Sequence, residues 1–129
     1  MNYAYTIVYV ADVAASLAFF EAAFGLKQRF LHESGAYGEL DTGATALAFV
    51  DHETALDSVG QPYVAAAESA RPLGMEIGLS TDDVPAAFAR AVAAGATPLK
   101  EPVTKPWGQT VAYVRCPDGS LVELCTPMA

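Results

Sequence analysis

Two stretches of the chain repeat one pattern of apolar and polar positions. Each has a short apolar strand, an aspartate, an amphipathic helix and a closing glycine: "YTIVYVADVAASLAFFEAAFG" and "EIGLSTDDVPAAFARAVAAG". Aligning the two stretches places Asp12 on Asp83 and Val13 on Val84. An internal duplication is the simplest explanation of this repeat.

The two predicted helices have clear start and stop signals. Asp12 and Asp83 each provide a side-chain oxygen that accepts a hydrogen bond from the first free amides of a helix. Gly25 and Gly95 suit the left-handed position that ends a helix. The apolar residues fall on one stripe of each helix, which predicts that they face the core: Val13, Leu17, Phe20 and Phe24; Val84, Phe88, Ala91 and Val92.

Three short apolar runs follow each helix and predict strands. They lie at residues 28–33, 37–41 and 45–50 in the first half, and at residues 97–100, 110–115 and 121–126 in the second. Each half therefore predicts a βαβββ module in a single α+β domain, with residues 1–51 in the first module and 74–129 in the second. Residues 52–73 form a linker that is long for a structureless loop, so we expect a crossing connection, a lid or a short helix.

Hairpin turns fix which strand residues share a face. The turn at "CPDGS", with Gly119 in the left-handed position, sets Val114 opposite Val122 and Tyr113 opposite Glu123. Apolar side chains then meet the helix, and the opposite face of the sheet, here named the open face, carries Tyr113, Arg115, Leu121, Glu123 and Cys125. In the first half, pairing Leu40 with Leu47 leaves Glu39, Ala46, Ala48 and Val50 on the open face.

Composition and charge restrict the partners. The 129 residues are 53% hydrophobic and carry a net charge of −8, which disfavours nucleic acid and anionic membranes and favours a cationic ligand. No apolar run approaches a membrane span and the N-terminus shows no signal peptide, so we expect a cytoplasmic protein. Cys116 and Cys125 are predicted to stay apart as reduced thiols.

The chain resembles the vicinal oxygen chelate superfamily, which includes glyoxalase I, bleomycin-resistance proteins and extradiol dioxygenases. The resemblance rests on "VADVAASLAFFEAAFGL", "TDDVPAAFARAVAAGA" and "KPWGQTVAYVRCPDGSLVEL". It implies two βαβββ modules whose sheets curve into a cup, and a homodimer. The family's metal-ligand positions would fall on Tyr5, Ala48, Glu76 and Glu123, so only half of the usual ligand set remains.

Seven residues are candidates for binding a ligand in the cup: Tyr5, Tyr9, Ala48, Glu76, Trp107, Tyr113 and Glu123. The carboxylates attract positive charge, the tyrosines stack on planar groups, and Ala48 leaves apolar room where a metal ligand would stand. Structural interpretations stay open beside these. Glu123 could instead form an ion pair with Arg115. The tyrosines could simply cover the sheet or form a dimer contact, and Trp107 could pack against the edge of the sheet.

Three functional hypotheses follow. The first is a metal-free protein that sequesters an aromatic or cationic small molecule, in the manner of bleomycin-resistance proteins, without a cofactor. The second is a metal-dependent lyase or isomerase of glyoxalase type, in which Glu76 and Glu123 hold a divalent metal completed by Glu39, a histidine or water. The third is a protein that acts through its dimer surface. The sequence is compatible both with an enzyme and with a binding protein.

Overall fold

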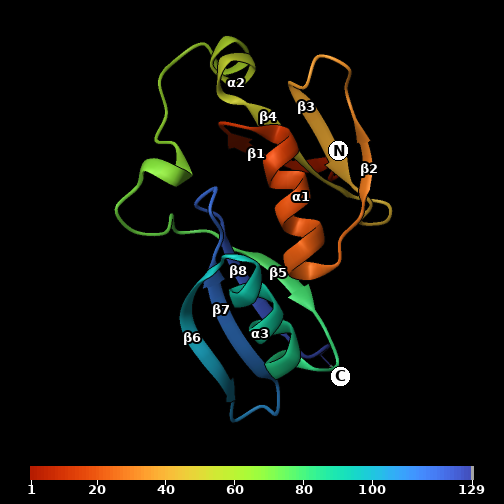
Figure 1. The fold of residues 1–129 in the computed structure, drawn as a ribbon, viewed down its shortest axis with the longest axis vertical. Helices are drawn as coiled ribbons and strands as arrows, with labels where there is room; N and C mark the ends of the chain where they lie inside the picture. Colours follow the sequence, from red (N-terminus) through yellow and green to blue (C-terminus); the bar gives the residue numbers. More distant parts are fainter. Residues whose placement is uncertain (129) are drawn as a thin grey trace.

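A computed structural model describes residues 1–128 of the chain (Figure 1). The first module contains β1 (Tyr5–Val10), α1 (Val13–Phe24), β2 (Gln28–Leu31), β3 (Tyr37–Leu40) and β4 (Ala46–Asp51). The linker contains α2 (His52–Val59) and a single 3₁₀ turn, η1 (Ala66–Glu68). The second module contains β5 (Ile77–Ser80), α3 (Val84–Ala94), β6 (Thr97–Thr104), β7 (Thr110–Arg115) and β8 (Leu121–Cys125). The predicted α+β fold of two βαβββ modules is confirmed.

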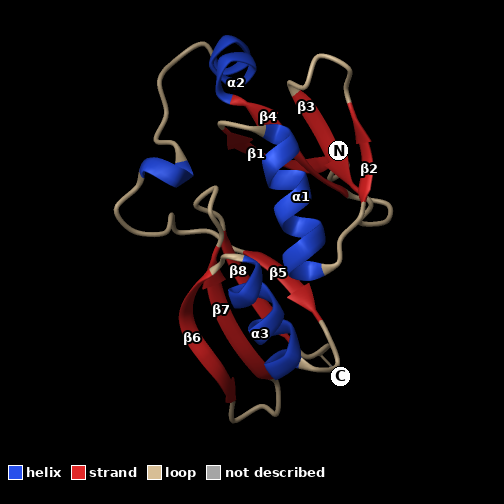
Figure 2. Cartoon of the chain, viewed as in Figure 1, coloured by secondary structure: helices blue, strands red, loops and turns tan. Residues whose placement is uncertain are grey.

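Each module forms one four-stranded sheet, whose strands are red in Figure 2. The first sheet has the order β1-β4-β3-β2 and the second has the order β5-β8-β7-β6. In both, the first strand is parallel to the last strand of the module, and the remaining pairs are antiparallel. This repeated order is the structural counterpart of the sequence repeat.

The predicted helix caps are confirmed. Asp12 Oδ1 accepts from the amide of Ala15, and Asp83 Oδ1 accepts from the amide of Ala86. Gly25 and Gly95 end the two helices in the left-handed region. No helix within residues 1–128 is long and apolar enough to cross a membrane.

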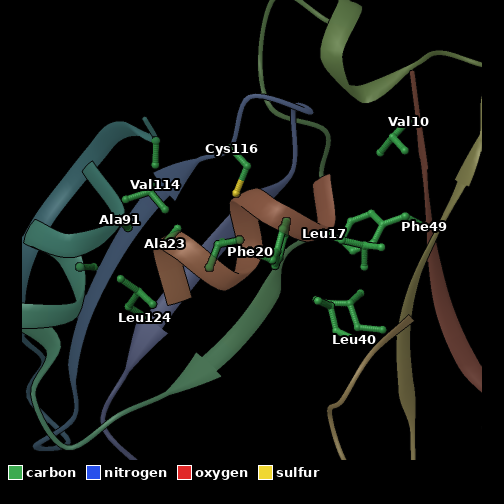
Figure 3. Close-up of a cluster of buried hydrophobic side chains, with 14 of the residues drawn as sticks. Val10, Leu17, Phe20, Ala23, Leu40, Phe49, Ala91, Val114, Cys116 and Leu124 are labelled. Atoms are coloured by element: carbon green, nitrogen blue, oxygen red, sulfur yellow. The ribbon is translucent and has the colours of Figure 1, made fainter. Parts of the chain in front are cut away.

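The two modules share one hydrophobic core. Leu17 and Phe20 of α1 lie between side chains of the first sheet and side chains of the second (Figure 3). Helices α1 and α3 also pack directly against each other. The open face of each sheet therefore lies on the far side of that sheet from the shared core.

The predicted strand pairings agree with the structure. Leu40 pairs with Leu47, and Val114 pairs with Val122. Cys116 and Cys125 are free thiols, as predicted. Met75, just before β5, is 62% exposed, and its amide donates to Leu73 O over 2.8 Å in a tight turn.

Candidate ligand-binding site

A pocket of about 220 Å³ lies between the two modules and beneath the linker. We name it the linker pocket. One wall is β1, a second is the start of β5 with the β7–β8 turn, and the linker forms the third. The lining residues are Ile7, Val8, Tyr9, Tyr63, Val64, Ala66, Leu73, Met75, Glu76, Ile77, Gly119, Ser120 and Leu121.

The lining is apolar except at a few positions. Glu76 is the one charged side chain among the lining residues. Tyr9 and Tyr63 form an aromatic corner, with their rings edge-on and their centroids 5.0 Å apart. The hydroxyl of Tyr63 is hydrogen-bonded to Nδ1 of His52 at 2.5 Å, which fixes the ring from the start of α2. Such a pocket suits a guest with an apolar or aromatic body and one positive charge.

Glu76 also belongs to a carboxylate pair on the open face of the second sheet. Gly78 pairs with Glu123 on β8, and a Cβ at Gly78 would lie 3.9 Å from Oε1 of Glu123, so the carboxylate of Glu123 lies close to β5. The carboxyl group of Glu123 lies close enough to that of Glu76 to change its pKa. Burial raises the pKa of Glu76, and the hydrogen bond and negative charge of Glu123 raise it further.

Tyr113 supports this pair from β7. Its hydroxyl donates to Oε2 of Glu123 over 3.0 Å. Burial raises the pKa of Tyr113 to about 12, and the hydrogen bond and charge of Glu123 act in the same direction. The structure thus brings together three of the predicted site residues, Glu76, Tyr113 and Glu123.

Arg115 does not pair with Glu123, so that alternative is wrong. Its Nη2 donates instead to Ala66 O and to Ser69 O, at 2.8 Å in both cases. The guanidinium at the end of β7 thus reaches carbonyl groups of the linker. Strand periodicity contains no signal for the path of the linker, and the sequence therefore did not reveal this contact.

Tyr5 and Ala48 lie on the open face of the first sheet, where Tyr5 pairs with Ala46 and Ala48 pairs with Glu39. Tyr5 is 54% exposed, whereas Ala48 is fully buried. Tyr37 donates to Oε2 of Glu39 over 2.7 Å on the same face. These residues are not among those that line the linker pocket.

Trp107 lies apart from the other candidates. It is 65% exposed in the loop between β6 and β7, and its Nε1 donates to Gln109 Oε1 over 3.1 Å. It lines a separate hollow with Gly108, Gln109, Pro127 and Met128.

The ligand set does not fit a metal centre within one chain. Among residues 1–128, no three His, Cys, Asp or Glu side chains lie close enough together to hold an ion. Glu76 and Glu123 provide two carboxylates where three or four protein ligands are typical. The candidates for completing the shell are engaged elsewhere: Glu39 with Tyr37, His32 with Ser34 and His52 with Tyr63.

Several residues that line the pocket were not predicted from the sequence. Tyr63, Leu73 and Met75 all belong to the linker or its end, which has no helix or strand period to orient its side chains. The aromatic residue in "QPYV" was the one available signal, because tyrosine in a linker of an otherwise compact domain is often in contact with a neighbouring surface.

Paired βαβββ modules around a shared core define the class of fold. The chain belongs to the Glyoxalase/Bleomycin resistance protein/Dioxygenase superfamily, whose family model matches residues 2–124. The resemblance seen in the sequence is thereby confirmed. No curated protein matches the chain.

Solved structures share the fold at low sequence identity. A glyoxalase-related enzyme from Fulvimarina pelagi is 23% identical, with a TM-score of 0.83 over 98% of this chain and 88% of that one. A glyoxalase/bleomycin resistance protein/dioxygenase family enzyme from Burkholderia phytofirmans PsJN is 21% identical, with a TM-score of 0.79 over 99% and 100%. TioX from Micromonospora sp. ML1 is 21% identical, with a TM-score of 0.72 over 99% and 100%.

Proposed function

We propose that the chain binds a small organic molecule with an aromatic or apolar body and a positive charge, and holds it without chemical conversion. The observation that carries this proposal is the lining of the linker pocket, in which Glu76 is the single charged side chain among apolar and tyrosine surfaces. An aromatic cation would bury its body against Tyr9 and Tyr63 and pair its charge with Glu76.

The carboxylate pair strengthens the preference for a cation. Glu76 and Glu123 repel each other when both are ionised, and a positive group between them or beside them relieves that repulsion. The net charge of −8 also attracts cations to the molecule as a whole.

The two thiols support binding rather than covalent chemistry. Burial raises the pKa of the Cys116 thiol well above its usual range. Burial also raises the pKa of Cys125, and the negative charges of Glu123 and Glu76 add to the effect. Both thiols are therefore protonated at neutral pH, and a protonated thiol is a poor nucleophile.

We also propose that the chain forms a homodimer. Each sheet ends in two edge strands, β1 and β2 in the first and β5 and β6 in the second, and these edges are available for pairing. Tyr3 and Tyr5 at the β1 edge are 72% and 54% exposed. Light scattering should give twice the chain mass of 13.5 kDa, and a mass of one chain would contradict this part of the proposal.

Binding can be tested by calorimetry with thioflavin T, a planar aromatic monocation, and with a panel of aromatic amines matched to neutral analogues. Glu76→Gln should weaken the binding of the cations by roughly tenfold or more, since it removes a charge-assisted contact. Glu101→Gln is the matched control, because Glu101 is exposed on β6 and does not line the pocket. Equal effects of the two substitutions, or cations that bind no better than their neutral analogues, would contradict the proposal.

A further inference from the structure

Residues 61–73, which we name the strap, run between two glycines with free space around them. Gly60 ends α2 in the left-handed region with φ 77°, and Gly74 lies just before β5. A Cβ added at either glycine would meet nothing within 4 Å. The backbone at both ends of the strap therefore has room to rotate, as the hinges of a moving segment require.

The strap covers the linker pocket without joining the hydrophobic core. Four residues of the strap line the pocket: Tyr63, Val64, Ala66 and Leu73. Ala55 is the last buried residue before the strap, and every residue from 56 to 76 is exposed or half-buried. A segment with so little buried apolar surface opens at a lower free energy than the strands beneath it.

Polar contacts from the β7–β8 hairpin hold the strap in place. Arg115 Nη2 donates to Ala66 O and Ser69 O, at the two ends of the η1 turn. Gly119 packs so closely on the same turn that a Cβ there would lie 2.2 Å from the carbonyl carbon of Ala66. These contacts converge on one turn of the strap, next to the pocket residue Ala66.

We infer that the strap opens and closes over the linker pocket and that Arg115 is the positioning residue that latches it closed. Opening exchanges two hydrogen bonds to a guanidinium for hydrogen bonds to water, while both sheets keep their pairing. The identity of the ligand in the pocket rests on the proposed function, but the opening and closing of the strap takes place in the protein without ligand.

Hydrogen exchange tests the latch without any ligand. The amides of Glu68 and Ser69 donate to Ala65 O and Ala66 O, so both report on the η1 turn that Arg115 contacts. In Arg115→Met their exchange should accelerate roughly tenfold relative to the wild type, because the donor to the strap is lost. Arg71→Met is the matched control: Arg71 is an exposed cation on the strap itself, and its loss should leave these rates unchanged.

Equal strap exchange in the wild type and Arg115→Met would overturn the inference. If Arg115→Met also accelerates exchange in the sheets, Arg115→Lys decides, because the lysine ammonium keeps a charged nitrogen that can donate to the strap. Strap exchange slower than in Arg115→Met, with unchanged sheets, then supports the latch, and strap exchange as fast as in Arg115→Met overturns it.

Stopped-flow measurement of thioflavin T binding gives the association and dissociation rates, which distinguish a lost latch from a damaged pocket. A lost latch should accelerate association and dissociation together, whereas damage to the pocket should accelerate dissociation alone. If thioflavin T and its relatives do not bind, the proposed function fails, while the exchange experiment still tests the strap.

Discussion

The hydroxyl of Tyr113 donates to Oε2 of Glu123, its partner across the β7–β8 hairpin, over 3.0 Å. The first sheet has a counterpart, in which Tyr37 donates to Oε2 of Glu39 over 2.7 Å. Each open face thus carries a tyrosine–carboxylate pair, although the two pairs occupy different strand positions. Burial is the largest cause that raises the pKa of each tyrosine to about 12, and the adjacent carboxylate adds to it.

These pairs predict a loss of stability at alkaline pH. Because the pKa of each tyrosine in the fold is raised from 10.0 to about 12, its contribution to stability is complete below pH 10 and is lost as the pH rises toward 12. Tyr113→Phe and Tyr37→Phe should each make the free energy of unfolding less sensitive to pH in this window. Urea unfolding at a series of pH values measures this, with the exposed Tyr3→Phe as control. An unchanged slope in both variants would contradict the prediction.

Glu76→Gln should raise the thermal stability of the free protein at neutral pH. The raised pKa of Glu76 means that its ionised form is disfavoured in the fold, so the fold loses stability as the pH rises through that pKa. A neutral amide at this position removes the repulsion from Glu123. The gain in melting temperature should be present at pH 7 and absent at a pH where Glu76 is protonated in both states. A variant that is less stable at pH 7 would show that the two carboxylates do not repel each other.

The same pair predicts the metal content of the protein. Two carboxylates from one chain are too few for a tightly held divalent ion, so protein purified without chelator should contain far less than stoichiometric metal. Elemental analysis of the wild type and Glu76→Gln measures this. Stoichiometric metal in the wild type that disappears in Glu76→Gln would instead support a metal-dependent activity.

Sequence periodicity predicted the modules well because each module is a local unit. The caps at Asp12 and Asp83 and the pairing of Tyr113 with Glu123 follow from spacings of a few residues and from turn chemistry. Such short-range constraints are encoded in the pattern itself.

The pocket was harder to predict, because its third wall is the linker. The position of Tyr63 next to Tyr9 and the contact of Arg115 with Ala66 depend on how the chain crosses between modules. No repeat or period fixes that path. The sequence therefore predicted Glu76 as a site residue, but not the surface that faces it.

Gly119→Ala should destabilise the protein more than Gly43→Ala does. Both glycines have similar positive φ angles, 89° and 88°, so the backbone cost of a side chain is about 1–2 kcal/mol at each. A Cβ at Gly43 meets nothing within 4 Å, whereas at Gly119 it would collide with the backbone of Ala66. The difference between the two variants in urea unfolding isolates that steric contact, and we expect an excess of about 1 kcal/mol or more for Gly119→Ala. Equal losses of unfolding free energy in the two variants would mean that the strap moves away from the new methyl group without a free-energy cost.

Arg90→Met tests how the two modules are joined. From α3, Arg90 Nε donates to Ala22 O over 2.9 Å and Nη2 donates to Glu21 O over 3.2 Å, at the last turn of α1. Glu21 O also accepts from the amide of the C-cap residue Gly25, so Arg90 adds a second donor there, and a cation at a helix C-terminus is favourable. Arg90→Met should therefore lower the free energy of unfolding by about 1–2 kcal/mol, with both modules still unfolding in one transition. Arg29→Met, which removes an exposed cation from β2, is the matched control and should cost about 0.5 kcal/mol or less. Equal effects of the two substitutions would show that the charge, rather than the contact with α1, determines the loss.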